Sequence, residues 1–92
     1  MSEIALFEQK EIRRIWQDEK WYFSVVDVVA VLTDSADPRQ YIKRMRARDS
    51  ELSVNWGTIC TQVQMIAADG KRRKVQAADA EGLLRIIQSI PS

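Results

Sequence analysis

The sequence WYFSVVDVVAVLTDSADPRQYIKRMRARD, which spans residues 21–49, contains the strongest structural signals of this chain. It begins with aromatic residues that favour a β-strand, continues with a short apolar run, and passes through a turn that ends in a proline. A segment rich in arginine and lysine follows the proline. This order predicts a strand, a buried helix and then a second helix that displays positive charge.

The apolar run is predicted to be a helix because its start carries a capping signal. Ser24 is a favourable N-cap, and Asp27 stands three residues later, where it would complete a capping box. Valine and leucine occur on nearly every side of the resulting helix over residues 25–32, so we expect it to be buried all round. The β-branched valines alone would favour a strand, and the helix prediction therefore depends on the cap.

The second helix has the best-defined start in the chain. Asp37 is a suitable N-cap, and Pro38 occupies the first helical position, which predicts a helix over residues 38–48. At 100° per residue, the positions that face the core are Tyr41, Ile42 and Met45. The cations lie elsewhere: Arg39, Lys43 and Arg46 share an arc about 60° wide, and Arg44 and Arg48 lie on a third flank.

Short strands and one more helix are expected around these two helices. Alternation and turn signals predict strands over residues 4–8, 11–17 and 20–23. A capping Asp79 predicts an amphipathic helix over residues 80–90, which Pro91 ends. The expected fold is α+β, a small antiparallel sheet or hairpins packed with about three helices, in the order strand-strand-strand-helix-helix-hairpin-helix.

The hairpin is predicted over residues 57–78, with its turn at Ala68, Asp69 and Gly70. A three-residue turn with Gly70 in the left-handed conformation pairs Val63 with Val75 and Thr61 with Ala77 on the buried side. A two-residue turn would lose this match, so we favour the longer one. It places Arg72 and Lys74 on an outer face with Gln62, Gln64 and Gln76.

Composition limits the chain to one small domain. It has 92 residues, of which 46% are hydrophobic and 29% are charged, enough for a single core. We expect that core to be one cluster of Trp21, Phe23, Val28, Leu32, Ile42, Met45, Val63, Leu83 and Ile87. The chain stops directly after an apolar helix, which suggests a domain over residues 1–92 excised from a longer chain.

The residue inventory excludes several kinds of site. The chain has no histidine and a single cysteine, Cys60, so Cys/His zinc sites, Ser-His-Asp triads and an internal disulfide are impossible. Cys60 is expected to be an inert, buried thiol within a strand. Trp16, Trp21 and Trp56 are interpreted as core or sheet-face residues. No leader or membrane-spanning run is evident, so the sequence predicts a cytoplasmic binding domain without catalytic residues, metal or cofactor.

Positive charge is concentrated although the net charge is only +1. Residues 37–48 carry five cations and one anion, and residues 71–74 carry four cations and no anion. A charged helix face is often only a solvated face, and cations on a hairpin can protect a strand edge from pairing with other chains. Two such patches together favour a polyanion as partner. The candidate contact residues are Arg39, Gln40, Lys43, Arg44, Arg46, Arg48, Lys71, Arg72, Arg73 and Lys74.

Three stretches carry a resemblance to a known family. They are WYFSVVDVVAVL, the proline-started DPRQYIKRMR and the final EGLLRIIQSIPS. In this order the chain resembles the BRO family N-terminal domain of phage and prophage antirepressor-type proteins and baculovirus repeated proteins. The shared markers are Trp21, Phe23, Asp27 with Val28, Leu32 and Pro38. Many relatives carry a glycine near the turn after the first helix, where this chain has Thr33, Asp34 and Ser35.

The resemblance implies a DNA-binding domain, commonly followed by a different C-terminal domain. Together with the charge pattern, it predicts that the helix over residues 38–48 lies against the groove of duplex DNA while the hairpin at residues 71–74 holds the backbone. Base contacts would then come from Gln40 or Lys43, with Arg39 near the helix start. The alternative is a protein-interaction module that binds a phage repressor or another regulator. A homodimer would suit so small a DNA reader.

Overall fold

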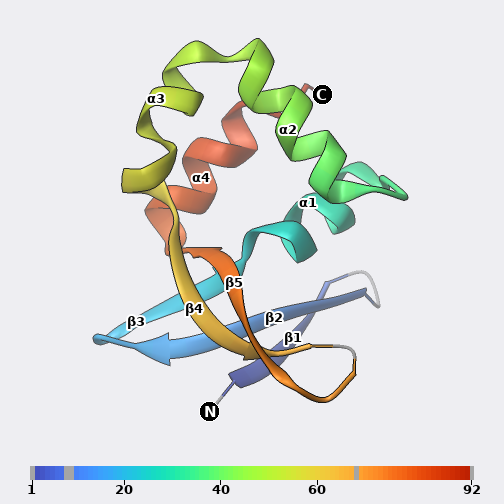
Figure 1. Ribbon diagram of the computed structural model, residues 1–92, viewed down its shortest axis with the longest axis vertical. Helices are drawn as coiled ribbons and strands as arrows, with labels where there is room; N and C mark the ends of the chain where they lie inside the picture. The colour runs from blue at the N-terminus through green and yellow to red at the C-terminus, as the bar shows by residue number, and fades with distance from the viewer. Residues whose placement is uncertain (1, 8–9, 68, 92) are drawn as a thin grey trace.

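The computed structural model describes residues 2–7, 10–67 and 69–91, which form five strands and four helices (Figure 1). The strands are β1 (Ser2–Phe7), β2 (Lys10–Gln17), β3 (Lys20–Ser24), β4 (Thr61–Ile66) and β5 (Arg72–Ala78). The helices are α1 (Val25–Thr33), α2 (Pro38–Arg48), α3 (Ser50–Ile59) and α4 (Ala80–Gln88). The expected α+β class is confirmed, and α3 is an element that the sequence reading did not anticipate.

The five strands form one antiparallel sheet in the order β1-β2-β3-β5-β4. β3 and β5 share only the pairs Phe23↔Ala78 and Ser24↔Ala77, so the β4/β5 hairpin diverges from the first three strands beyond that point. The sheet curls far enough for β4 to come near β2. Figure 1 shows the helices gathered at one end of the molecule and the strands at the other.

Helix α1 begins at the predicted cap, but the capping box is not completed. Ser24 Oγ accepts the Asp27 backbone N–H at 3.4 Å, as expected. The Asp27 carboxylate instead accepts the backbone N–H of Arg13 at 2.9 Å and its Nε at 2.8 Å. Charge-assisted bonds of this kind are stronger than a bond to one neutral N–H, which explains the exchange. Arg13 also donates to the Ile66 carbonyl at 3.3 Å, so it connects β2, α1 and β4.

Helix α2 has the bounds that its cap signals predict. Asp37 accepts the Gln40 N–H at 3.1 Å, and Pro38 stands at the first helical position. Ile42 and Met45 are buried, as the helical period requires. The start of the helix and its rotation about its own axis are therefore set by local sequence.

The expected hairpin over residues 57–78 is wrong at its N-terminal end. Asp49 caps α3 by accepting the Leu52 N–H at 3.1 Å, and α3 runs to Ile59 before β4 starts. Leu52 and Trp56, four residues apart, are the buried positions of this helix. Cys60 is consequently the C-cap of a helix and not a strand residue, although it is buried as expected. Burial raises the pKa of its thiol to about 11, so little thiolate exists at neutral pH.

The predicted register of the β4/β5 hairpin is confirmed. Val63 pairs with Val75 and Thr61 with Ala77. The turn closes through the Ala67 N–H, which donates to the Lys71 carbonyl at 2.8 Å. Gly70 has a φ of 82°, the left-handed conformation that the three-residue turn requires. The predicted turn residue Ala68 lies outside the described residues.

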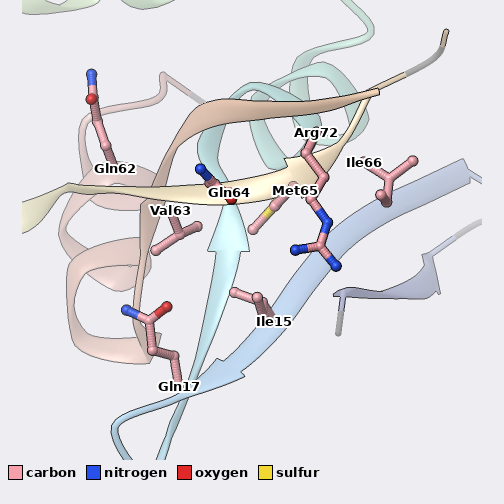
Figure 2. A pocket seen from close by; sticks show the side chains of 8 residues that line it. All are labelled: Ile15, Gln17, Gln62, Val63, Gln64, Met65, Ile66 and Arg72. Atoms are coloured by element: carbon pink, nitrogen blue, oxygen red, sulfur yellow. The ribbon is translucent and has the colours of Figure 1, made fainter. Parts of the chain in front are cut away.

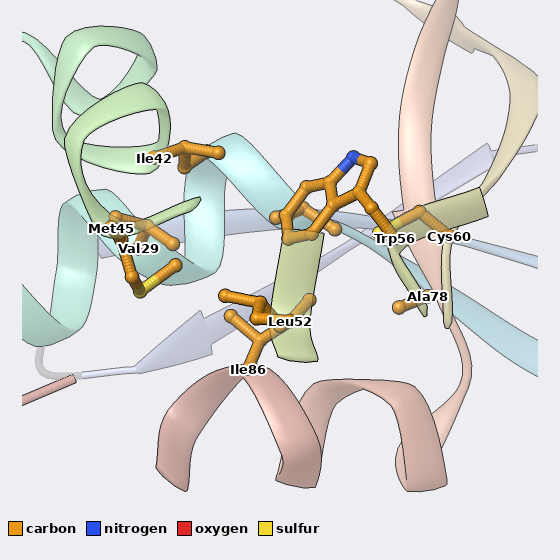
Figure 3. Packing of buried hydrophobic residues seen from close by; sticks show 9 residues of the cluster. Val29, Ile42, Met45, Leu52, Trp56, Cys60, Ala78 and Ile86 are labelled. Carbon is orange, nitrogen blue, oxygen red and sulfur yellow. The ribbon is translucent and has the colours of Figure 1, made fainter. Parts of the chain in front are cut away.

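Among the residues whose burial the structure describes, the core forms two clusters and not the single cluster expected. The larger one lies between the helices and the sheet, and Figure 3 shows its side chains converging from α1, α2, α3, α4 and β5. The smaller one joins Val63, Met65 and Ala77 inside the curled sheet. Of the predicted core residues, Val28, Ile42, Met45 and Val63 are buried, and Trp21, Phe23 and Leu83 are half-buried.

Two core predictions are wrong, because Leu32 and Ile87 are 42% and 41% exposed. Leu32 stands in the last turn of α1, which otherwise buries Val25, Val28, Val29 and Val31. α4 faces the core with Ile86, and Leu83 and Ile90 pack beside it, which rotates Ile87 toward the surface. The expectation that α1 is buried all round holds for its valines only in part, since Val26 is half-buried.

The cap of α3 makes stability sensitive to acid. Asp49 accepts the Leu52 N–H, the Ser89 hydroxyl at 2.8 Å and Arg85 Nη2 at 3.4 Å. These bonds, the one from Leu52 first, hold the pKa of Asp49 below its ordinary value of 3.8. The stabilisation is complete above the unfolded pKa and is lost as the pH falls through the lower pKa of the folded state.

We therefore expect the free energy of unfolding, measured by urea denaturation, to decline below about pH 4. The variant Asp49→Asn keeps a capping side chain but cannot titrate, so its decline should be shallower. Asp79, which caps α4 and also has a lowered pKa, accounts for part of the decline that remains. Identical pH profiles for Asp49→Asn and the unchanged protein would contradict this role.

Candidate nucleic-acid interface

An open groove of about 450 Å³ lies between α2 and β5. α2 provides most of its wall, and single residues of α1, α3 and β5 complete it. The lining residues are Val26, Arg39, Ile42, Lys43, Arg46, Ala47, Ser53 and Gln76. Three of them are cations and none is acidic, so the groove combines an apolar floor with a positive rim.

The predicted cationic flank of α2 faces this groove. Arg39 and Lys43 are exposed, and Arg46 is half-buried beside them. The Pro38 start and the burial of Ile42 and Met45 fix the rotation that brings the three cations to one side. Across the described ranges, no carboxylate forms an ion pair with any of the three. Their charge is thus available to a partner.

Arg46 is held in place by Trp56. Its guanidinium carbon lies 4.8 Å from the centre of the Trp56 ring, a cation–π contact. Arg46 Nε and Trp56 Nε1 are both buried without a hydrogen-bond partner, and Trp56 as a whole is only 4% exposed. In Figure 3 the indole nitrogen points away from the other side chains of the cluster. Trp56 does not line the groove, so the contact positions the Arg46 guanidinium from behind the groove wall.

The outer face of β5 extends the positive surface toward the hairpin. Gln76 lines the groove, and Lys74 stands two residues away on the same face, about 7 Å further along the strand. The register places Gln64 opposite Lys74 and Gln62 opposite Gln76, as predicted. Of the basic patch at residues 71–74, Lys74 is therefore the residue whose face of β5 leads toward the groove.

Arg72 is two residues from Lys74 along β5, but it contributes to a different pocket. It lines an open space of about 480 Å³ along β4, together with Ile15 and Gln17 of β2. Figure 2 shows its guanidinium among the lining residues, with Gln62 and Gln64 on one side of β4 and Val63 and Met65 on the other. Arg72 therefore lines this space and not the groove, which Gln76 lines four residues further along β5.

The remaining candidates of the sequence reading lie outside the groove. Arg73 is on the opposite face of β5 from Lys74, and its Nη2 donates to Asp69 at 2.6 Å. Lys71 stands in the turn, where its backbone N–H donates to Asp69. Gln40, Arg44 and Arg48 are exposed on other sides of α2. The predicted set is therefore divided, with Arg39, Lys43, Arg46 and Lys74 as its connected part.

Sequence reasoning missed the contributions of α3 to the site. Ser53 lines the groove and Trp56 supports Arg46, and both lie on the helix that was not anticipated. The signal that would have found them is the combination of a capping Asp49 with Leu52 and Trp56 at helical spacing.

Comparisons of the chain with protein-family models, curated proteins and solved structures found no match. The resemblance to the BRO family N-terminal domain therefore stays a prediction from the sequence. Among the helices of the described residues, none is long and apolar enough to cross a membrane. Within the same residues, no group of three or more Cys, Asp or Glu side chains is placed to hold a metal ion. The groove is the feature on which a functional proposal can be based.

Proposed function

We propose that this chain is the DNA-binding domain of an antirepressor-like regulatory protein and that it holds duplex DNA through the groove side of α2 and the outer face of β5. The observation that carries the proposal is the convergence of Arg39, Lys43 and Arg46 on one groove that contains no acidic residue. A row of cations without neighbouring carboxylates is what a phosphate backbone requires.

The chemistry of the residues divides between affinity and specificity. Arg39, Lys43 and Lys74 are exposed cations and would contact phosphates, which gives affinity and orientation. Gln40 is exposed between Arg39 and Arg44 on the helix circumference, and its amide can both donate and accept, so it is the base-reading candidate. Arg46 is held by its contact with Trp56 and would add positive charge at the rim of the groove.

A second candidate function is supported by the apolar floor of the same groove. Val26, Ile42 and Ala47 line it, and a phosphate backbone has no apolar surface to cover them. An acidic segment of a repressor-type protein, with apolar side chains between its carboxylates, would use both the floor and the rim. The same variants distinguish the two functions when each partner is measured separately.

The test of DNA binding is the salt dependence of affinity for a fluorescein-labelled duplex of random sequence, measured by fluorescence anisotropy. Three phosphate contacts predict a slope of about −3 for the logarithm of the association constant against the logarithm of salt. The variant Lys43→Ala should reduce the slope by about 1 and weaken binding about eightfold at 0.1 M salt. Arg39→Ala should change the slope and the affinity by about the same amounts as Lys43→Ala.

The matched control is Lys20→Ala, which removes the same charge from β3, where Lys20 Nζ already lies 3.3 Å from Asp79. It should leave affinity nearly unchanged. Equal losses for Lys20→Ala and Lys43→Ala would mean that only net charge matters. Absence of salt-sensitive binding to any duplex, combined with binding of a repressor-type protein that Lys43→Ala weakens, would replace DNA with the protein partner.

A further inference from the structure

A second open pocket, of about 390 Å³, lies where the β2/β3 hairpin meets the start of α4. It shares no residue with the cationic groove. Its lining residues are Trp16, Glu19, Lys20, Trp21, Phe23, Asp79, Ala80 and Glu81. The pocket thus combines three aromatic side chains with three carboxylates and one ammonium group, and the Arg14 guanidinium lies against the Trp21 ring beside it.

The aromatic wall of the pocket is open to solvent at Trp16. Trp16 pairs with Trp21 across the strands, and their rings meet edge to face with centroids 5.4 Å apart. Trp16 is nevertheless 55% exposed, and Trp21 and Phe23 are only half-buried. A large exposed aromatic surface rimmed by polar residues is typical of a binding site.

The acidic rim indicates the charge of the occupant. Lys20 neutralises the charge of Asp79, since its Nζ lies 3.3 Å from Asp79 Oδ2. Glu19 and Glu81 are exposed, and no cation within the described part of the chain forms an ion pair with either. Trp21 already carries a cation of the chain itself, since the guanidinium carbon of Arg14 lies 4.1 Å from the centre of its ring. Trp16, which is largely exposed, is therefore the ring that is open to a cation of the occupant.

The surface beyond the pocket remains apolar along α4. Leu84 and Ile87 follow Ala80 at intervals of four and three residues, so the three share one side of the helix within an arc of about 60°. Both Leu84 and Ile87 are exposed. An occupant longer than one residue would therefore meet an apolar strip next to the aromatic pocket.

We propose that this surface binds a basic amphipathic peptide segment of a partner protein, with an arginine or lysine side chain against Trp16 between Glu19 and Glu81, and apolar side chains along Leu84. Guanidinium and ammonium groups bind aromatic faces and carboxylates together, which no neutral or acidic peptide does. The site is independent of the proposed DNA contacts, because the two surfaces have opposite charge and no common residue.

The test uses a short fluorescein-labelled peptide of alternating arginine and leucine, titrated with the whole chain and followed by anisotropy. We expect saturable binding, a loss of about tenfold or more for Trp16→Ala, and a similar loss for the double variant Glu19→Lys/Glu81→Lys. The controls are Val54→Ala and Glu51→Lys, exposed positions on α3, which should bind like the unchanged protein. A peptide with glutamate in place of arginine should not bind.

Circular dichroism establishes that each variant is folded, and the charge variant tests the site even if Trp16→Ala does not fold. Absence of saturable binding, or equal binding by the unchanged protein and the double variant, would overturn the proposal. An equal loss for Glu51→Lys would also overturn it, since attraction to any acidic surface would then suffice. Self-association that Trp16→Ala abolishes in sedimentation equilibrium would replace the peptide with a second copy of this chain.

Discussion

Replacement of Leu52 by alanine is expected to lower the free energy of unfolding by about 3 kcal/mol. Leu52 is fully buried on α3, and in Figure 3 it lies next to Ile86 of α4. The substitution removes an apolar contact between these two helices and leaves a cavity that surrounding side chains fill only partly. Urea denaturation measures the change, which is a large share of the stability of a domain of this size.

The control is Leu84→Ala, which deletes the same atoms from a residue that is 57% exposed on α4. Its cost should stay below about 0.5 kcal/mol. The exposed Leu32 and Ile87, which the helical period assigned to the core, should likewise cost less than Leu52. A loss for Leu52→Ala no greater than that for Leu84→Ala would show that α3 does not pack as described.

The helices that the sequence predicts well are those with a local start signal. Ser24, Asp37 and Asp79 each accept the N–H three residues further on, and α1, α2 and α4 begin directly after them. Asp49 carries the same signal for α3. The hairpin was instead expected to start at residue 57, within this helix, and only Leu52 and Trp56 mark the apolar side of α3. Two apolar residues are a weak helical pattern, so the capping signal at Asp49 is needed to predict this helix.

The partition of apolar residues between core and surface depends on contacts that no local pattern specifies. Ile86 and Ile87 are adjacent on α4 and chemically identical, yet Ile86 is buried and Ile87 is exposed. The position of α3 against α4 determines which of the two isoleucines is buried. In the same way, the Asp27 carboxylate binds Arg13 and does not complete the expected capping box, because the curl of the sheet brings β2 beside α1.

The candidate interface shows the same division between local and long-range information. Helical period alone places Arg39, Lys43 and Arg46 on one flank, and strand period alone places Lys74 on the face of Gln76. That these two faces border one groove follows from the approach of β5 to α2, which connects segments far apart in the sequence. The stacking of Arg46 on Trp56 could not be predicted without α3.

The close approach of α3 and α4 leaves no room for a side chain at Gly82. A Cβ atom at Gly82 would lie 2.7 Å from the Ile59 carbonyl oxygen and 3.0 Å from Ala78 Cβ. Alanine normally stabilises a helix interior by about 1 kcal/mol relative to glycine. Here the overlap with backbone must be relieved by moving the end of α3 away from α4, so we expect Gly82→Ala to lower the free energy of unfolding by about 2 kcal/mol.

Gly57 provides the matched control, because the same substitution in α3 should have the opposite sign. A Cβ atom at Gly57 would meet nothing within 4 Å, and the residue is exposed in a helical conformation. Gly57→Ala is therefore expected to raise the free energy of unfolding by about 0.5–1 kcal/mol, through helix propensity and a less flexible unfolded chain. Urea denaturation of the two variants in parallel measures both changes. If Gly82→Ala stabilised the domain as Gly57→Ala does, the contact between Gly82 and the end of α3 would not exist in solution.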